Sequence, residues 1–160
     1  MNNLGIGLAV FGMALAAALP GWGSAKGVGM AGQAAAAVVG TEPGHFGKVL
    51  VLQLLPGTQG IYGLLIAFIT MSNIGLIGGN SAMSTIKGLS YLMACLPMAI
   101  VGLLSAIHQG KASVACINLV AKRPDQFGKA MIFPAMVETY AILALLISLL
   151  AITGVSNLPV

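Results

Sequence analysis

The chain has 160 residues, of which 58% are hydrophobic and 6% are charged, and its formal net charge is +4 at pH 7. Its apolar runs exceed the roughly 20 residues that cross a hydrocarbon core of about 30 Å, so we predict an all-α integral membrane protein. This length holds four spanning helices and leaves no room for a separate soluble catalytic domain. Seven basic residues spread over such a chain act as topology signals and do not indicate a nucleic-acid partner.

Four transmembrane helices are predicted from apolar segments at about residues 4–39, 46–77, 85–120 and 127–152. The residues before the first segment lack the basic n-region of a secretory signal, so we expect this helix to remain in the mature protein. Polar and turn-forming clusters at 40–44, 78–81 and 122–125 separate the segments. The first and third segments are longer than a bilayer needs, so we expect them to be tilted or to protrude on one side.

Basic residues predict the orientation of these helices. Lys48, Lys122, Arg123 and Lys129 lie near the loops that follow the first and third segments, whereas the opposite side offers only Lys87. Positive residues concentrate on the cytoplasmic side of membrane proteins. We therefore expect both of these loops to be cytoplasmic and both termini to lie outside.

Residues of the first half recur in the second half at a fixed offset of 81 positions and without a gap (24 matches 105, for example). Matching pairs are Ser24-Ala25 with Ser105-Ala106, Phe46-Gly47-Lys48 with Phe127-Gly128-Lys129, Thr58 with Thr139, and Leu64-Leu65-Ile66 with Leu145-Leu146-Ile147. Such self-similarity predicts two fused, tandem helical hairpins, at residues 1–80 and 81–160. Each copy crosses the membrane an even number of times, so the copies share one orientation, unlike the inverted repeats of many transporters.

Glu138 is the one acidic residue inside an apolar segment, since Glu42 and Asp125 both lie in short polar loops. A carboxylate at the centre of a membrane helix is costly and usually holds a proton, a cation or a fixed partner. Its counterpart in the first repeat is Gly57. We therefore expect the second hairpin to carry the functional group, the alternative being a structural glutamate hydrogen-bonded between helices.

Several polar groups are predicted at the depth of Glu138. Glu138 lies nine positions from Lys129, Gln59 eleven from Lys48 and Gln109 thirteen from Lys122. Because a helix rises by about 1.5 Å per residue, all three fall near mid-membrane. One helical face carries Leu55, Thr58, Gln59 and Tyr62. Pro56 lacks an N–H, so a perturbed turn there also offers backbone oxygens.

This set of oxygens favours Na⁺ as the bound ion. A hard monovalent cation needs several oxygens to replace its water shell, whereas a proton needs only the carboxyl and one acceptor. Two alternatives remain open. The glutamines and the threonine could simply join helices by hydrogen bonds, or Lys111 could form an ion pair with Glu138. Because Lys111 lies about 200° around the helix from Gln109, we expect Lys111, like Lys26, to face a polar or lipid-headgroup surface instead.

Other motifs indicate packing rather than chemistry. A G-x-G-x-x-G match at residues 27–32 lies inside a membrane helix without a preceding strand, so we reject a dinucleotide site. Small residues nearby predict a surface for close helix packing, namely Gly21, Gly23, Ala25, Gly27, Gly29 and Gly32. Cys95 and Cys116 fall in apolar runs and are expected to be buried free thiols. His45 and His108 have no acid or thiol cluster for a metal site, and no nucleophile with its base is recognisable.

Four motifs resemble the proteolipid (K, or c) subunit of V-type ATPases, particularly the sodium-pumping bacterial kind. They are Gly23-Ser24-Ala25-Lys26-Gly27-Val28-Gly29, Leu54-Leu55-Pro56-Gly57-Thr58-Gln59-Gly60, Gln109-Gly110-Lys111 and Ala135-Met136-Val137-Glu138-Thr139-Tyr140-Ala141. The resemblance covers essentially the whole chain. It implies a homo-oligomeric ring in a bacterial plasma membrane, with the first and third helices inside and the second and fourth outside.

The resemblance also implies roles for residues and partners. Glu138 would carry the transported Na⁺, or H⁺ as in relatives that look similar around this glutamate. The other ligands would be the Leu55 carbonyl, Thr58, Gln59 and Gln109, with Tyr62 shielding the site and hydrogen-bonded to the glutamate. A stator membrane subunit of the a or I type and central-stalk subunits would be partners. ATP hydrolysis would occur in other subunits, since no hydrolytic site is recognised in this chain.

Two other functions account for parts of the sequence. A small proton-coupled multidrug antiporter could also use one membrane glutamate, but its pocket should be lined by aromatic residues. The single Trp22 and an aromatic content of 6% argue against it. A passive structural or membrane-fusion proteolipid would account for the small-residue surface but would give Glu138 no function.

Overall fold

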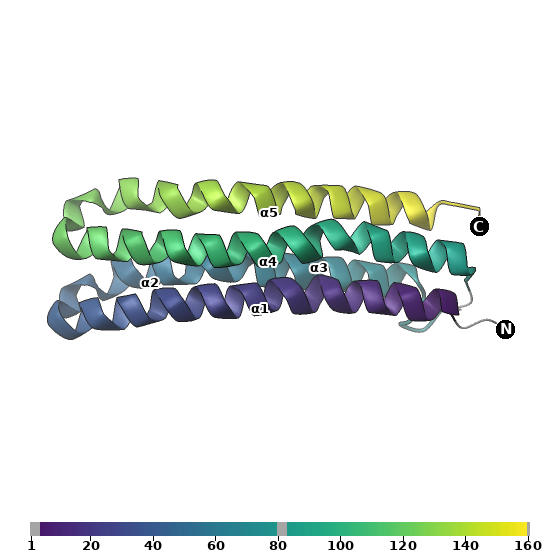
Figure 1. Cartoon of the computed structure of the whole chain (residues 1–160), viewed down its shortest axis with the longest axis horizontal. Coiled ribbons are helices and arrows are strands. Elements are labelled where there is room, and N and C mark those ends of the chain that lie inside the picture. Colours follow the sequence, from purple (N-terminus) through teal and green to yellow (C-terminus); the bar gives the residue numbers. More distant parts are fainter. Residues whose placement is uncertain (1–3, 80–82, 160) are drawn as a thin grey trace.

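The computed structural model describes residues 4–79 and 83–159, which form four long helical arms (Figure 1). The first arm is α1 (Leu4–Thr41) and the third is α4 (Thr85–Lys122). The second arm joins η1 (Pro43–His45), α2 (Phe46–Leu54), η2 (Leu55–Gly57) and α3 (Thr58–Asn73), and the fourth joins η3 (Pro124–Gln126) and α5 (Phe127–Ser156). Each arm is long and apolar enough to cross a membrane. The predicted four-helix membrane fold is confirmed.

The helices repeat at the offset found in the sequence. Helices α1 and α4 have 38 residues each and begin at positions 4 and 85, which differ by that offset. The starts of α2 and α5, at positions 46 and 127, differ by the same amount. The repeats differ in the second helix of each hairpin, which is interrupted at Pro56 in the first copy and continuous in the second. The predicted boundary between positions 80 and 81 lies outside the described residues.

The end of the second arm was predicted wrongly. Helix α3 ends at Asn73, four positions before the predicted end at residue 77. The chain turns there through Gly75 and Gly78, whose φ angles of 69° and 73° lie in the left-handed region that glycine adopts readily. Helix α4 then begins beyond Ser84, whose hydroxyl accepts a hydrogen bond of 3.2 Å from the backbone N–H of Lys87.

Helix α1 packs along α4 with their backbones in close approach. A Cβ atom built on Gly12 would lie 2.6 Å from the Cα atom of Leu92, and one built on Gly27 would lie 2.5 Å from the carbonyl oxygen of Ala106. Glycine at these positions therefore sets the distance between the two helices. Helix α3 packs on α1 and α5 on α4, so the shorter arms form a second layer.

Two apolar clusters fill the interior. One lies toward the termini and includes Tyr91 and Met98, and the other lies toward the loops and includes Leu52 and Ile117. Cys95 and Cys116 are free and buried, as predicted. Polar side chains occupy the level between the two clusters, where Gln59 and Gln109 are both fully buried. We expect this level, where the predicted site residues lie, to be near mid-membrane.

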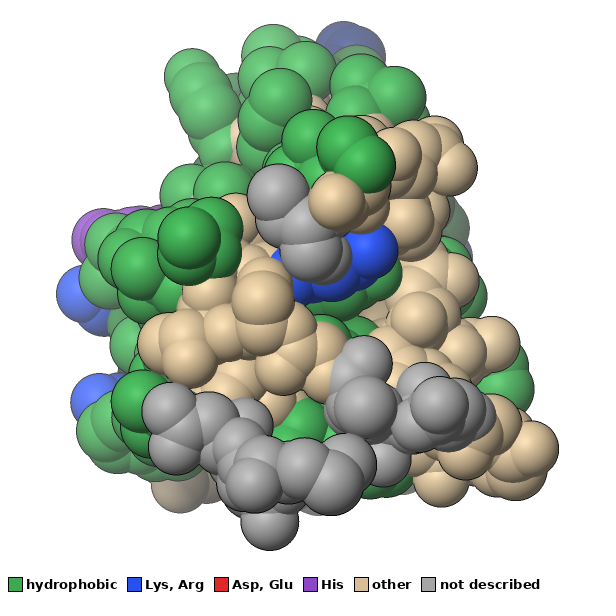
Figure 2. Space-filling model, turned by 90° about the vertical axis from the view of Figure 1, so that its right-hand side faces the viewer, with side chains coloured by type: hydrophobic (Ala, Val, Ile, Leu, Met, Phe, Trp, Pro, Cys, Tyr) green, Lys and Arg blue, Asp and Glu red, His purple; other side chains and the backbone are tan. Residues whose placement is uncertain are grey.

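The two described ends of the chain lie at one end of the bundle, and the connections after α1 and α4 lie at the other (Figure 1). Figure 2 shows the first of these ends, where no acidic side chain is visible among the described residues. There the ammonium group of Lys87 donates a hydrogen bond of 3.0 Å to the carbonyl oxygen of Leu158. Which end faces the cytoplasm stays a prediction.

Candidate functional site in the middle of the helical bundle

The first segment that contributes to the site is a short 3₁₀ turn at Leu55–Gly57. Pro56 occupies the centre of this turn and cannot donate a backbone hydrogen bond. The carbonyl oxygen of Leu55 instead accepts the backbone N–H and the hydroxyl of Thr58, the latter at 3.1 Å. The predicted perturbation at Pro56 is confirmed, and it leaves the Leu55 carbonyl bonded outside the regular helical pattern.

The carboxylate of Glu138 is held by donors from two other helices. The Tyr62 hydroxyl, on α3, donates to Oε1 at 2.6 Å. The Gln109 amide nitrogen, on α4, donates to Oε2 at 3.2 Å. Glu138 itself is half-buried on α5, so three helices from both repeats converge on one carboxylate.

A chain of buried amides and hydroxyls continues from this carboxylate. The Gln59 amide nitrogen donates to Oε1 of Gln109 and, at 3.2 Å, to the hydroxyl of Ser105. The Ser105 hydroxyl in turn donates to the carbonyl oxygen of Val137 at 3.0 Å. At the other side, the Thr58 hydroxyl lies 3.4 Å from Oε1 of Gln59. Buried polar groups of this kind are stable when they are mutually satisfied, and here they are.

The structure brings all six residues predicted from the sequence into this network, namely Leu55, Thr58, Gln59, Tyr62, Gln109 and Glu138. Sequence reasoning missed Ser105 and the carbonyl oxygen of Val137. A signal for Ser105 was present, because it precedes Gln109 by four positions and so shares its helical face.

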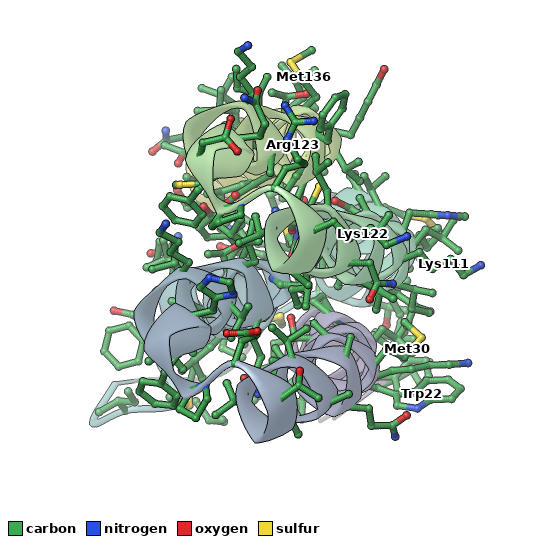
Figure 3. All side chains as sticks on the ribbon, turned by 90° about the vertical axis from the view of Figure 1, so that its left-hand side faces the viewer. Trp22, Met30, Lys111, Lys122, Arg123 and Met136 are labelled. Carbon is green, nitrogen blue, oxygen red and sulfur yellow. The ribbon has the colours of Figure 1, made fainter. Side chains whose placement is uncertain are left out.

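The carboxylate is bonded by a hydroxyl and an amide rather than by a cation of the protein. Among the described residues, Arg123 and Asp125 form the one salt bridge, at 3.6 Å in an exposed loop. Lys111 is exposed and points away from the bundle (Figure 3), so the alternative ion pair with Glu138 is not formed. The described part of the chain also holds no cluster of three His, Cys, Asp or Glu side chains. A single carboxyl group among neutral polar side chains suits a proton or a monovalent cation.

Comparisons with known proteins agree with this arrangement. The family model of the ATP synthase C subunit matches the chain twice, at residues 11–70 and 92–151. The V-type sodium ATPase subunit K of Enterococcus hirae is 52% identical over 151 residues, which cover 94% of this chain and 94% of that protein. The A-type ATP synthase subunit K of Methanocaldococcus jannaschii is 38% identical over 148 residues, covering 92% of this chain and 63% of that longer protein. The chain therefore belongs to the family of ATP synthase C subunits, as a ring-forming proteolipid of the V-type kind.

Proposed function

We propose that this rotor-ring protein carries Na⁺ across the membrane on the carboxylate of Glu138. The observation that carries the proposal is the convergence of α3, α4 and α5 on one carboxylate in the middle of the bundle. We expect this level to be near mid-membrane, where a charge is most costly. The relative that is 52% identical, a sodium ATPase subunit, supports the choice of ion. The surplus of neutral oxygens beside the carboxylate supports it as well.

Rotation of a glutamine amide can replace the hydrogen-bond donor that faces Glu138 by an acceptor. In the structure the Gln109 amide offers its NH₂ to Glu138. Half a turn of this amide about its last bond turns its oxygen toward Glu138 and its nitrogen toward Gln59, since an amide carries both groups. The Gln59 amide, which now donates to the Gln109 oxygen, must turn as well so that its own oxygen accepts. We infer that this rotation accompanies Na⁺ entry, and that the oxygens of Gln59, Thr58 and Leu55 complete the shell. The Tyr62 hydroxyl can keep its bond to Oε1 throughout.

The free-energy cost of an unpaired charge in lipid couples the binding and release of Na⁺ to rotation of the ring. With Na⁺ bound, the carboxylate and the ion are together neutral and can face lipid. Without Na⁺, the carboxylate must stay beside water or a basic group, because an isolated charge in hydrocarbon is too costly. We propose that a stator membrane subunit of the a or I type supplies that polar contact, and that central-stalk subunits transmit rotation driven by ATP hydrolysis elsewhere. The connections after α1 and α4 would then face the cytoplasm.

The proposal is tested by neutralising the carboxylate. Glu138→Gln, in the assembled ATPase complex reconstituted into vesicles, should abolish ATP-driven Na⁺ uptake because the amide cannot balance the charge of the ion. Glu42→Gln is the matched control, since Glu42 is an exposed loop residue, and it should leave uptake unchanged. Undiminished uptake in Glu138→Gln would contradict the role of this carboxylate. ATP-driven H⁺ uptake without Na⁺ uptake in the unaltered complex would contradict the choice of ion.

A further inference from the structure

Helix α3 begins inside the bundle, directly after the 3₁₀ turn that contains Pro56. At the start of a helix the first backbone N–H groups lack regular partners within their own helix, and a side chain at the N-cap position commonly accepts one of them. The N-cap residue of α3 is Gly57, which has no side chain. An unsatisfied N–H group is costly in hydrocarbon. An interruption at this place therefore needs an acceptor from another part of the chain.

Ser24, on α1, supplies this acceptor. Its hydroxyl oxygen accepts a hydrogen bond of 2.9 Å from the backbone N–H of Gly60, the third residue of α3. This is the N–H group that the side chain of an N-cap residue often accepts. Ser24 is buried, and the two helices are close, since a Cβ atom built on Gly60 would lie 3.3 Å from the Ser24 hydroxyl oxygen. A neighbouring helix thus caps α3.

The capped segment carries ion ligands of the proposed site. Thr58 and Gln59 immediately precede Gly60, and the Leu55 carbonyl lies one turn earlier in the 3₁₀ turn. In a continuous helix the N–H of Gly60 would bond the carbonyl of Pro56, four positions back. The Ser24 hydroxyl offers this N–H an acceptor that does not require the regular turn. The bond therefore stabilises the interrupted backbone of the second arm.

The equivalent serine of the second repeat makes a different contact. Ser105 corresponds to Ser24, and its hydroxyl donates a hydrogen bond of 3.0 Å to the carbonyl oxygen of Val137. Val137 corresponds to Pro56, but α5 runs through this level without a break. The serine hydroxyl therefore donates to the second helix of its hairpin where that helix is continuous, and accepts where Pro56 interrupts it. This difference indicates that the contact of Ser24 is matched to the interruption.

We propose that Ser24 is a positioning residue for the ion site, which acts by holding the interrupted form of the second arm. Without its hydroxyl, the N–H of Gly60 turns toward the carbonyl of Pro56 and the arm approaches a regular helix. The Leu55 carbonyl then accepts the N–H of Gln59, as in a regular helix, and is withdrawn from the ion. The inference rests on the proposed function, which takes Na⁺ as the ion and the Leu55 carbonyl as one of its ligands.

Protection of Glu138 from a carboxyl-reactive carbodiimide by Na⁺ measures this effect in membranes that contain the assembled complex. Ser24→Ala should raise the Na⁺ concentration that gives half-maximal protection about 5- to 50-fold, the range expected for the loss of a buried hydrogen-bond acceptor. The rate of labelling without Na⁺ should not change, because the Tyr62 hydroxyl and the Gln109 amide still bond the carboxylate. The variant therefore weakens Na⁺ binding selectively.

Ser148→Ala is the matched control for a loss of stability alone. The Ser148 hydroxyl accepts a hydrogen bond of 3.1 Å from the backbone N–H of Met98 and is fully buried. Ser148 lies ten positions from Glu138, or about 15 Å along α5. Its loss removes the same kind of bond between helices. We expect both this variant and Ser24→Ala to lower the temperature at which the ring dissociates in detergent, and Ser148→Ala to leave the half-protecting Na⁺ concentration unchanged.

A second variant disturbs the contact without removing the hydroxyl. Gly60→Ala would place a methyl group 3.3 Å from the side chain of Ser24, so we expect the half-protecting Na⁺ concentration to rise, but by less than in Ser24→Ala. Ser113→Ala controls for the removal of a buried hydroxyl. Ser113 is fully buried, and its hydroxyl has no hydrogen-bond partner among the described residues, so this variant should leave the half-protecting concentration unchanged.

The outcomes separate the role of Ser24 from the choice of ion. An unchanged half-protecting Na⁺ concentration in Ser24→Ala and Gly60→Ala would overturn the positioning role and leave Na⁺ binding at Glu138 intact. An equal rise in Ser24→Ala and Ser148→Ala would also overturn it, because the rise would then follow stability alone. If Ser24→Ala does not assemble, the comparison of Gly60→Ala with Ser148→Ala decides. Absence of Na⁺ protection in the unaltered ring would overturn the proposed function and this inference together.

Discussion

The two hairpins share a helical framework and differ in the chemistry placed on it. Their first helices, α1 and α4, have the same length of 38 residues, and Ser24 and Ser105 occupy equivalent positions. At the level of the site, however, Glu138 replaces Gly57 and Gln109 replaces Val28. The two repeats therefore share their helical framework, whereas the carboxylate and the amide of the site are in the second repeat.

The network around the carboxylate also depends on which residue each repeat contributes. Tyr62 and Gln59 come from the first repeat, and their second-repeat counterparts are Leu143 and Tyr140. A Cβ atom built on Gly57 would contact the side chain of Val28 at 3.6 Å, where Glu138 meets the Gln109 amide. A carboxylate in the first repeat would thus lack these partners. The site requires both repeats, each in its own role.

Moving the carboxylate between repeats should have the largest effect. Glu138→Gly combined with Gly57→Glu keeps the number of carboxylates, yet the moved group faces Val28 instead of Gln109. We expect ATP-driven Na⁺ uptake to fall to background in vesicles containing the assembled complex. Uptake at more than half of the original rate would show that the surrounding polar groups are dispensable. Gel analysis of the intact ring controls for assembly.

Replacing Gln109 by valine, the residue at the equivalent position of the first repeat, should have an intermediate effect on Na⁺ binding. Gln109→Val removes one oxygen from the proposed ion shell and one of the two hydrogen bonds that the buried Gln59 amide nitrogen donates, leaving the bond to Ser105. The loss of such a bond costs about 1–3 kcal/mol, so we expect Na⁺ affinity to fall about 10- to 100-fold. The carboxyl group can still take a proton, and a lower pH should compete more strongly with Na⁺. An unchanged Na⁺ dependence of ATP hydrolysis would contradict this role of Gln109.

Removing the tyrosine hydroxyl should have the smallest effect of the three. Tyr62→Phe deletes the 2.6 Å bond to Glu138, but this donor can serve the carboxylate with or without Na⁺. Its loss therefore affects both states, and we expect Na⁺ affinity to change by a factor of about 3, within the range of a single hydrogen bond. Tyr140→Phe, on the exposed face of α5, should change it less. A larger effect of Tyr140→Phe would place the second tyrosine at the site instead.

The helical framework was predictable because its causes are local. Apolar runs of bilayer length determine the four arms, and the repeat offset of the sequence reappears in the starts of α1 and α4. The end of α3 was missed because it depends on the positive φ angles of Gly75 and Gly78, which apolar periodicity does not reveal. The predicted small-residue surface on α1 in fact divides, since Gly27 faces α4 while Gly29 is open.

Depth along the helices was enough to predict most of the site. Counting from the basic loops placed Gln59, Gln109 and Glu138 at one level, and they contact one another. Counting could not show which hydroxyls join the network, because that depends on how α4 and α5 are rotated against each other. Ser105 was therefore recognised only as part of the repeat, although its hydroxyl bonds Gln59 and the carbonyl of Val137.

Protection of Glu138 from a carboxyl-reactive carbodiimide at neutral pH tests the central claim most directly. Asp125 is an internal control for a general effect of the salt on the reagent, because it lies in an exposed loop. Hydrogen bonding from Gln126 lowers the pKa of its carboxyl group, so its labelling, which needs the protonated acid, should be slow with or without Na⁺. We predict that Na⁺ at tens of millimolar slows modification of Glu138, that K⁺ at the same ionic strength does not, and that labelling of Asp125 is unaffected. Modification of Glu138 at the same rate in Na⁺ and K⁺ would contradict Na⁺ binding at this carboxylate.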